Sequence, residues 1–265
     1  VIQSREATLQ LLASRHRFDC WRCPKDGMCE FYDLLKKHDV VFEEFGPGIA
    51  RSSDLITGSS ISQDQSKCVL CKRCVAVCQN VVTANVLKFN DDDGMNPIVS
   101  PVPGLSFDES GCIGCGQCVK TCPTGTLFQT DHTQKVFSFL RDKDNHVVVQ
   151  LDTTSNSAIA EEFGYAIDTN SEETIGKTYR ALQLLGFETI TNTDLGKDLQ
   201  AMEMARDFVE RYKESETLPL FTSTCPASTK FLELFKPETL EHLSTVKSPA
   251  VLQGSILKHN LLKQK

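Results

Sequence analysis

Apolar and polar positions form regular blocks along the second half of the chain. Short apolar or β-branched runs bounded by polar residues predict buried strands at 146–151, 187–191 and 218–222. Helical patterns cover 157–163, 172–185, 198–213 and 226–235. Gly164 and Gly186 close the first two helices, and Pro226 opens the last one. Strands that alternate with helices predict a parallel sheet with right-handed crossovers.

The first half of the chain has a less regular pattern. Residues 1–50 are predicted to be mostly helical, with partial apolar faces at 8–12 and 29–37 and a Gly-Pro-Gly loop signal at 46–48. Residues 51–66 are rich in Ser, Asp and Gln and predict a linker, and 90–104 predict a loop. The composition changes near residue 134, which divides the chain into predicted segments 1–50, 51–133 and 134–265.

Composition and charge narrow the classes of protein. The 265 residues suffice for two or three compact units, and 40% apolar residues make a buried core feasible. A net charge of −7 without a basic stripe argues against a nucleic-acid partner. No apolar stretch is long enough for a bilayer span, and the start at Val1 lacks a signal peptide and an initiator Met. We expect a reducing, cytoplasmic location and a chain that is processed or cut from a longer protein.

Twelve cysteines change the picture, because eight of them form two runs with the C-x2-C-x2-C-x3-C spacing of bacterial ferredoxins. In that pattern three thiolates wrap one cubane, and the fourth ligates the neighbouring cluster. The first predicted ligand set is Cys68, Cys71, Cys74 and Cys122. The second is Cys112, Cys115, Cys118 and Cys78. Zinc also binds paired C-x2-C, but two complete runs favour two adjacent [4Fe–4S] clusters that exchange electrons.

Two glycines, Gly114 and Gly116, lie inside the second cysteine loop. We interpret them as backbone room beside the cluster sulfurs. No strand precedes them, which argues against a dinucleotide site.

A third group of donors lies near the N-terminus and consists of His16, Cys20, Cys23 and Cys29. Three thiolates and one imidazole suit either zinc or an iron–sulfur cluster, and spacing alone leaves both open. His16 has the further alternative of an ordinary hydrogen-bonded side chain. In a cluster, a neutral imidazole in place of a thiolate would raise the reduction potential. With these three groups assigned, Cys225 alone remains, and no pair is left for a disulfide.

Several stretches together resemble the [FeFe] hydrogenases. The segment 16–29 is similar to the His/Cys cluster segment that these enzymes share with the large iron–sulfur subunit of respiratory complex I. The double ferredoxin run beside it resembles the hydrogenases more closely. The string FTSTCP at 221–226 resembles their TSCCP motif, which supplies the first cysteine of the catalytic H-cluster. The string LSTVKSP at 243–249 resembles their LSxxKSP segment, whose proline lines the cluster pocket.

The resemblance covers essentially the whole chain and implies an α+β multi-domain fold. A small His/Cys cluster domain and a ferredoxin-like domain with two [4Fe–4S] clusters would precede the first part of an α/β H-cluster domain with parallel strands. It implies three [4Fe–4S] clusters, with Cys225 as the first H-cluster ligand and Pro249 at its pocket. Ferredoxin or an NADH-oxidising subunit would be the electron partner, and the location would be cytoplasmic, or hydrogenosomal in a eukaryote. The later cysteine motifs are absent, so we expect a chain truncated at both ends relative to the family.

The chain also departs from the family at positions of the proton relay. Thr224 replaces the relay cysteine and, with its high pKa, would be a poor proton donor. The positions of two relay carboxylates and an arginine hold Met204, Asp207 and Arg211, and Ser244 matches the relay serine. The Ala-Pro pair near the catalytic iron's cyanide is replaced at 152–153, so that contact is lost. An ordinary solvated helix face is the alternative for the relay positions, and a buried free thiol is the alternative for Cys225.

These observations predict electron transfer and leave hydrogen turnover open. The first hypothesis is the electron-transfer portion of an enzyme that interconverts protons and H2 in the full-length protein. A second is a sensory homologue without fast turnover, which fits Thr224 and Met204. A third is an electron-carrying subunit similar to that of complex I.

Overall fold

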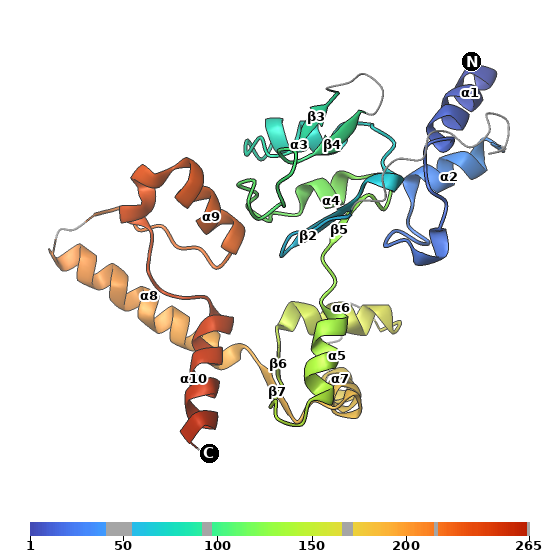
Figure 1. The fold of residues 1–265 in the computed structure, drawn as a ribbon. Coiled ribbons are helices and arrows are strands. Elements are labelled where there is room, and N and C mark those ends of the chain that lie inside the picture. Colours follow the sequence, from blue (N-terminus) through green and yellow to red (C-terminus); the bar gives the residue numbers. More distant parts are fainter. Residues whose placement is uncertain (41–54, 92–96, 166–171, 215–216, 264–265) are drawn as a thin grey trace. The chain divides into compact units, whose positions relative to one another are not determined.

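The computed structural model (Figure 1) describes residues 1–40, 55–91, 97–165, 172–214 and 217–263. The chain divides into two compact units, residues 1–130 and 131–265. The predicted loop at 46–48 and the predicted border at residue 50 lie outside the described residues, and the division into three segments stays a prediction. None of the helices that the structure describes combines the length and apolar character that a membrane span requires.

The first unit begins with two helices that share a small apolar core. These are α1 (Ile2–Ala13) and α2 (Glu30–Lys37), and a short 3-10 helix, η1 (Cys20–Arg22), lies in the connection between them. Both predicted apolar faces, 8–12 and 29–37, fall on these helices. Ala13, Phe31 and Leu35 pack with Val69 from the first cysteine loop. Because burial of apolar surface stabilises the folded chain, this shared core joins the N-terminal helices to the ferredoxin-like part.

The ferredoxin-like part consists of two cysteine-bearing helices and two small antiparallel sheets. The helices are α3 (Arg73–Asn80) and α4 (Gln117–Thr121), which pack against each other, and η2 (Gln65–Lys67) precedes the first cysteine loop. One sheet has the order β1 (Leu55–Ile56), β2 (Ile61–Asp64), β5 (Leu127–Gln129). The other is the hairpin of β3 (Lys88–Asn90) and β4 (Ile98–Ser100). Four ligand cysteines are buried in the same core as Phe107 and Leu127, so the core encloses the predicted clusters.

Two predictions for this part are wrong. The predicted linker at 51–66 contains the strands β1 and β2, and the predicted loop at 90–104 contains β4. The polar composition of β2 suggested exposure, but its polar side chains are buried and hydrogen-bonded. The Ser62 hydroxyl lies 2.9 Å from that of Thr130, and the Gln63 amide donates to the carbonyl oxygen of Val99 at 2.5 Å. These hydrogen bonds offset part of the cost of burying such groups, although the amide oxygen of Gln63 has no hydrogen-bond partner among the described residues.

The second unit contains a two-stranded parallel sheet and seven described helices. The strands are β6 (Val148–Leu151) and β7 (Thr189–Asn192). The helices are α5 (Thr133–Arg141), α6 (Thr153–Glu162), α7 (Glu172–Leu185), α8 (Asp194–Glu214), α9 (Pro226–Phe235), η3 (Pro237–His242) and α10 (Pro249–Lys263). The predicted parallel pair of strands and the four predicted helices are therefore confirmed, with α6 and α8 each starting about one turn earlier than predicted. The helices α5 and α10 were not predicted.

The predicted third strand at 218–222 is wrong. In the described residues this segment makes a single parallel bridge, between Phe221 and Leu243, and joins no sheet. The N–H of Phe221 donates to His242 at 2.8 Å, and its carbonyl accepts from the N–H of Ser244 at 2.8 Å. Pro219 has no N–H to offer a ladder. The two strings that resemble hydrogenase motifs, at 221–226 and 243–249, are instead paired with each other at their starts.

Helices α8 and α10 cross closely at one glycine, which leads to a stability prediction. A Cβ on Gly196 of α8 would overlap the carbonyl group of Pro249, whereas a Cβ on Gly176 of α7 would meet nothing within 4 Å. Gly196→Ala is expected to lower the free energy of unfolding by about 1–3 kcal/mol. Gly176→Ala is expected to raise it by about 0.5–1 kcal/mol, because alanine favours helix. Urea unfolding followed by circular dichroism measures both, and a gain in stability for both variants would contradict the close crossing.

Candidate metal centres

Three cavities in the first unit are each lined by four of the predicted ligands. The first is lined by Cys68, Cys71, Cys74 and Cys122, the second by Cys78, Cys112, Cys115 and Cys118, and the third by His16, Cys20, Cys23 and Cys29. We call these the first, second and third cavity. Their empty volumes, counted with their open mouths, are about 320, 350 and 400 Å³, so they suit groups of similar size. None of the twelve cysteines, which all lie in the described residues, forms a disulfide.

The fourth cysteine that lines each ferredoxin cavity comes from the other cysteine run. Cys74 and Cys78 are four residues apart on α3 and therefore lie on one face, one turn apart. The pKa of Cys74 lies well above its usual range. The main cause is burial of the thiol, and the second cause is the neighbouring thiol of Cys122. The pKa of Cys118 is raised to about 12. Burial is the main cause, and the nearby thiols of Cys112, Cys115 and Cys78 contribute in that order. These thiols hold their protons in the absence of metal, so a metal must displace protons to bind them.

The two ferredoxin loops have the same backbone conformation. Leu70 and Lys72 of the first loop have φ values of 56° and 60°, and Gly114 and Gly116 of the second have 70° and 71°. In each loop the N–H two residues after the first cysteine donates to that cysteine's sulfur, at 3.4 Å from Leu70 and from Gly114. Because side chains disfavour positive φ, the glycines relieve strain that the first loop retains. A Cβ on Gly114 would lie 3.1 Å from the Ser60 hydroxyl, and a Cβ on Gly116 would meet nothing within 4 Å, so room beside the cluster sulfurs stays a prediction.

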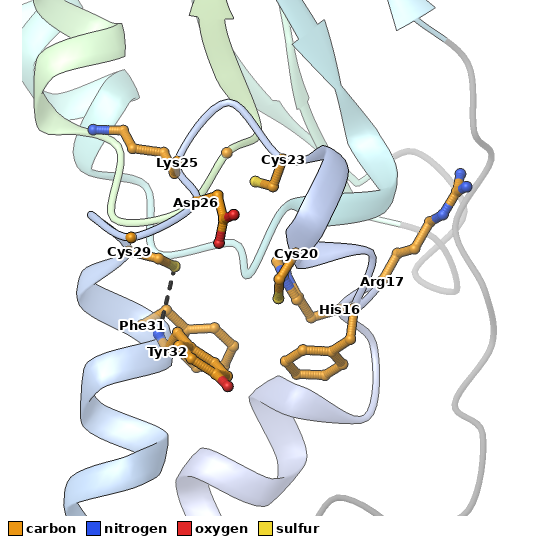
Figure 2. Close-up of a pocket in the computed structure, with 12 residues that line it drawn as sticks. His16, Arg17, Cys20, Cys23, Lys25, Asp26, Cys29, Phe31 and Tyr32 are labelled. Carbon is orange, nitrogen blue, oxygen red and sulfur yellow. Dashed lines mark hydrogen bonds between the residues drawn. The ribbon is translucent and has the colours of Figure 1, made fainter.

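The third cavity is lined mainly by the segment that connects α1 and α2 (Figure 2). Figure 2 shows the side chains of Cys20, Cys23 and Cys29 around one space, with His16 beside Cys20. Cys29 caps the start of α2, where its sulfur accepts the N–H of Tyr32 at 3.4 Å. Burial, followed by the thiols of Cys23 and Cys29, raises the pKa of Cys20. The three sulfurs therefore belong to one electrostatically coupled group.

The ring of His16 has one nitrogen in a hydrogen bond with the backbone. Its Nδ1 lies 2.9 Å from the carbonyl oxygen of Lys67, which can only accept, so Nδ1 carries the proton and Nε2 keeps its lone pair. Burial lowers the pKa of His16 and favours this neutral form. The ring also makes edge contacts with Phe18 and Phe31, at 4.8 and 5.4 Å between centroids. A carbonyl that fixes the tautomer is typical of histidine ligands.

The ferredoxin-like part forms one wall of the third cavity. A Cβ on Gly125 would overlap the sulfur of Cys23. The carbonyl of Pro123 accepts from the N–H of Phe31 at 3.3 Å and from the thiol of Cys29 at 3.6 Å. Sequence reasoning missed Gly125 and the Lys67 carbonyl as parts of this site. No local pattern links them to residues 16–29, because the contact depends on the folded chain.

Cys225 lies in the second unit, away from these cavities in the chain, and it is exposed. The alternative of a buried thiol is therefore wrong. Cys225 is the N-cap of α9, where hydrogen bonds from Ser228 and then Ala227 lower its pKa. Pro249 opens α10 beside Gly196. The H-cluster roles predicted for Cys225 and Pro249 stay predictions.

Three of the relay candidates meet between α8 and the segment before α10. Ser244 donates to one carboxylate oxygen of Asp207 at 2.6 Å, and Arg211 donates to the other at 2.8 Å. The hydrogen bond from Ser244, followed by Arg211, lowers the pKa of Asp207. Thr224 is exposed, and among the described residues no hydrogen bond joins it to this group. Asp207 is thus held ionised, and its relay role stays a prediction.

The same group predicts a pH dependence of stability. The folded-state pKa of Asp207 is lowered, so its contribution is complete above the unfolded aspartate value of about 3.9 and is lost as pH falls through the folded value. At pH 7 we expect Asp207→Asn to lower the free energy of unfolding by about 1–3 kcal/mol. Urea titrations at pH 7 and pH 3 measure this difference. A difference of equal size at both pH values would contradict the ionised state.

The substituted pair at 152–153 has a structural role of its own. Asp152 caps the start of α6 by accepting the N–H of Thr154 at 3.4 Å. Hydrogen bonds from Lys197, at 2.8 Å, and then from Thr193, at 3.0 Å, hold the pKa of Asp152 well below its usual range. A carboxylate paired with an ammonium therefore stands where the resemblance leads one to expect an Ala-Pro pair.

Comparison with known families gives matches over most of the chain. Residues 145–265 match the C-terminal domain of the iron only hydrogenase large subunit. Residues 63–126 match one family of 4Fe-4S dicluster domains, and residues 104–162 match a second family of such domains. The first unit thus contains iron–sulfur domains, and the second contains a hydrogenase-type domain with a parallel sheet.

Individual relatives agree with the family matches. The chain is 33% identical to "NADP-reducing hydrogenase subunit HndD" of Solidesulfovibrio fructosivorans, over 97% of this chain and 44% of that protein. It is 33% identical to "Iron hydrogenase 1" of Clostridium pasteurianum, over 96% and 44%. A subunit of the NADH-quinone oxidoreductase of Rhizobium meliloti is 30% identical over 50% of this chain and 15% of that protein. The chain spans less than half the length of these hydrogenase relatives.

Proposed function

We propose that this chain, which belongs to the family of the iron-only, or [FeFe], hydrogenases, is the iron–sulfur electron-transfer portion of a hydrogenase-like oxidoreductase. One observation supports the proposal above all: three cavities of similar volume are each lined by four of the predicted ligands. We infer three [4Fe–4S] clusters, held by eleven thiolates and His16. When bound, such clusters supply reversible one-electron carriers.

The residues around each cavity fit this chemistry. Backbone N–H groups of Leu70, Gly114 and Tyr32 donate to ligand sulfurs, which favours the more negative, reduced state of a bound cluster. The Lys67 carbonyl keeps Nε2 of His16 free to bind iron. A single zinc ion needs four donors about 2.0–2.3 Å from one point. Among the described residues, no group of three or more Cys, His, Asp or Glu side chains is arranged to hold a single metal ion, which supports a larger group in the third cavity.

The test is anaerobic reconstitution of the full chain with iron and sulfide in the presence of a small excess of zinc. We expect about twelve iron atoms per chain and little zinc, as three cubanes require. About eight iron atoms and one zinc would assign the third cavity to zinc and leave the other two assignments standing. Fewer than about eight iron atoms would overturn the proposal.

Hydrogen chemistry is proposed only for a longer protein that contains this chain. There Cys225 would be the first H-cluster ligand, with Pro249 at its pocket and Thr224, Ser244, Asp207 and Arg211 as relay positions. Redox subunits would be the electron partners, with a ferredoxin or an NADH-oxidising subunit as the specific choice. A hydrogen-evolution assay of the matured full-length protein with reduced viologen tests this. No H2 above background would exclude turnover, and slow H2 oxidation alone would favour a sensory homologue.

The match to the subunit of NADH-quinone oxidoreductase favours a second candidate, an electron-carrying subunit without hydrogen chemistry. The first unit would function identically in both cases, because its cavities do not depend on Cys225. Sequencing the gene beyond Lys265 separates the two candidates. Further cysteine motifs of the hydrogenase type would favour the enzyme, and their absence would favour the carrier.

A further inference from the structure

The two ferredoxin cavities have linings of different polarity. Besides its cysteines, the first cavity is lined by the buried polar side chains of Gln63, Thr124 and Thr126. The second is lined mainly by apolar side chains, which include Ile61 and Val82. Gln63 and Ile61 project from the same face of β2, two residues apart. One strand therefore presents an amide to the first cavity and a hydrocarbon to the second.

The two cysteine runs have the same spacing, so residues at corresponding positions in the two cavities can be compared directly. Cys122 and Cys78 take the same place in the two cysteine runs, as the fourth cysteine of each. Four residues further along, Thr126 lines the first cavity and Val82 lines the second. Threonine and valine have nearly the same shape and differ in one hydroxyl group. The hydroxyl is thus present beside one predicted cluster and absent at the same place beside the other.

The hydroxyl groups in the first cavity form a chain that ends on a ligand sulfur. The Thr124 hydroxyl lies 3.6 Å from the sulfur of Cys122 and 2.8 Å from the Thr126 hydroxyl. Once Cys122 is a thiolate ligand its sulfur can only accept, so Thr124 must donate to it. Thr124 then has no proton left for Thr126, so Thr126 must donate to Thr124. Both dipoles point at the sulfur and polarise each other.

We propose that Thr124 and Thr126 give the cluster of the first cavity a higher reduction potential than the cluster of the second cavity. The inference depends on the proposed function, since it presupposes both clusters. Reduction adds one electron, supplied by the redox partner, and makes the cluster more negative. Donors directed at its sulfurs stabilise that charge, whereas apolar surroundings do not. An electron that enters this pair therefore resides on the cluster ligated by Cys122, and the other cluster is the stronger reductant.

The experiment is a dithionite titration of the reconstituted full chain, followed by electron paramagnetic resonance. Cys71→Ser and Cys115→Ser each perturb the spectrum of one cluster and so assign the signals. In the unsubstituted chain we expect the signal that responds to C71S to appear first. Thr124→Val is expected to shift that midpoint to lower potential, and Thr124→Ser, which keeps the hydroxyl, is expected to leave it in place. Val82→Thr is expected to raise the other midpoint and narrow the gap.

A proton signal at the cluster separates a hydrogen bond from Thr124 to the cluster from a purely structural role of Thr124. Electron–nuclear double resonance of the reduced cluster should show an exchangeable proton that is lost in D2O and in T124V. Unchanged midpoints in T124V and V82T, or an earlier appearance of the C115S-sensitive signal, would overturn the inference. If T124V fails to bind a cluster, Thr126→Val, which does not touch the ligand, decides in its place. Failure of the proposed function would appear beforehand, as a low iron count in the unsubstituted chain.

Discussion

Replacing Gly125 with alanine is expected to reduce the iron content from about twelve to about eight atoms per chain. The added methyl group would overlap the sulfur of Cys23, so that ligand could not keep its place in the third cavity. The φ angle of Gly125 is outside the positive range, so an alanine there adds bulk without backbone strain. Iron analysis and the loss of one set of resonance signals measure the effect.

Gly27 offers the matched control for this variant. It lines the same cavity with a φ of 73°, and a Cβ there would meet nothing within 4 Å. Gly27→Ala therefore adds backbone strain of about 1–2 kcal/mol without overlapping a ligand sulfur, and we expect it to keep all its iron. If G125A kept about twelve iron atoms, the ferredoxin-like part would not form a wall of the third centre.

Replacing Cys122 with alanine is expected to destroy the cluster of the first cavity, although Cys122 follows Cys118 in the sequence. The structure places Cys122 with Cys68, Cys71 and Cys74, and the thiol of Cys74 responds electrostatically to it. About four of about twelve iron atoms should be lost, because three cysteines alone hold a cubane poorly. The signal that responds to C115S should survive.

Cys225→Ala is the control for this substitution. Cys225 is exposed at the start of α9 and lines none of the three described cavities, so its loss should leave the iron content unchanged. If C122A instead abolished the signal assigned through C115S and kept the other, the exchange of ligands between the two runs would be wrong.

Sequence reasoning succeeded where the determinants are local. The spacing of the cysteine runs predicted which thiols line each cavity, because the loop geometry is set within a few residues. Periodicity predicted α7 and α9, since each has its own apolar pattern and its own terminating Gly or opening Pro.

Sequence reasoning failed where contacts between residues far apart in the sequence determine the local structure. The strand β2 looked like a linker because its Gln63 and Ser62 find partners in β4 and beyond β5, which no local pattern indicates. The segment around Phe221 looked like a strand but pairs only with Leu243, because no sheet edge in the described residues receives it. Gly125 went unnoticed because its importance appears only when Cys23 lies against it.

The shared wall of the third cavity has a consequence for biosynthesis. On the ribosome the loop with Cys20, Cys23 and Cys29 emerges first, but Lys67 and Gly125, which complete its surroundings, emerge much later. Until then the three thiols are open to stray metals and oxidants in the cell. The surroundings of the N-terminal centre are therefore complete only after residue 125 has been made and has folded against the earlier loop.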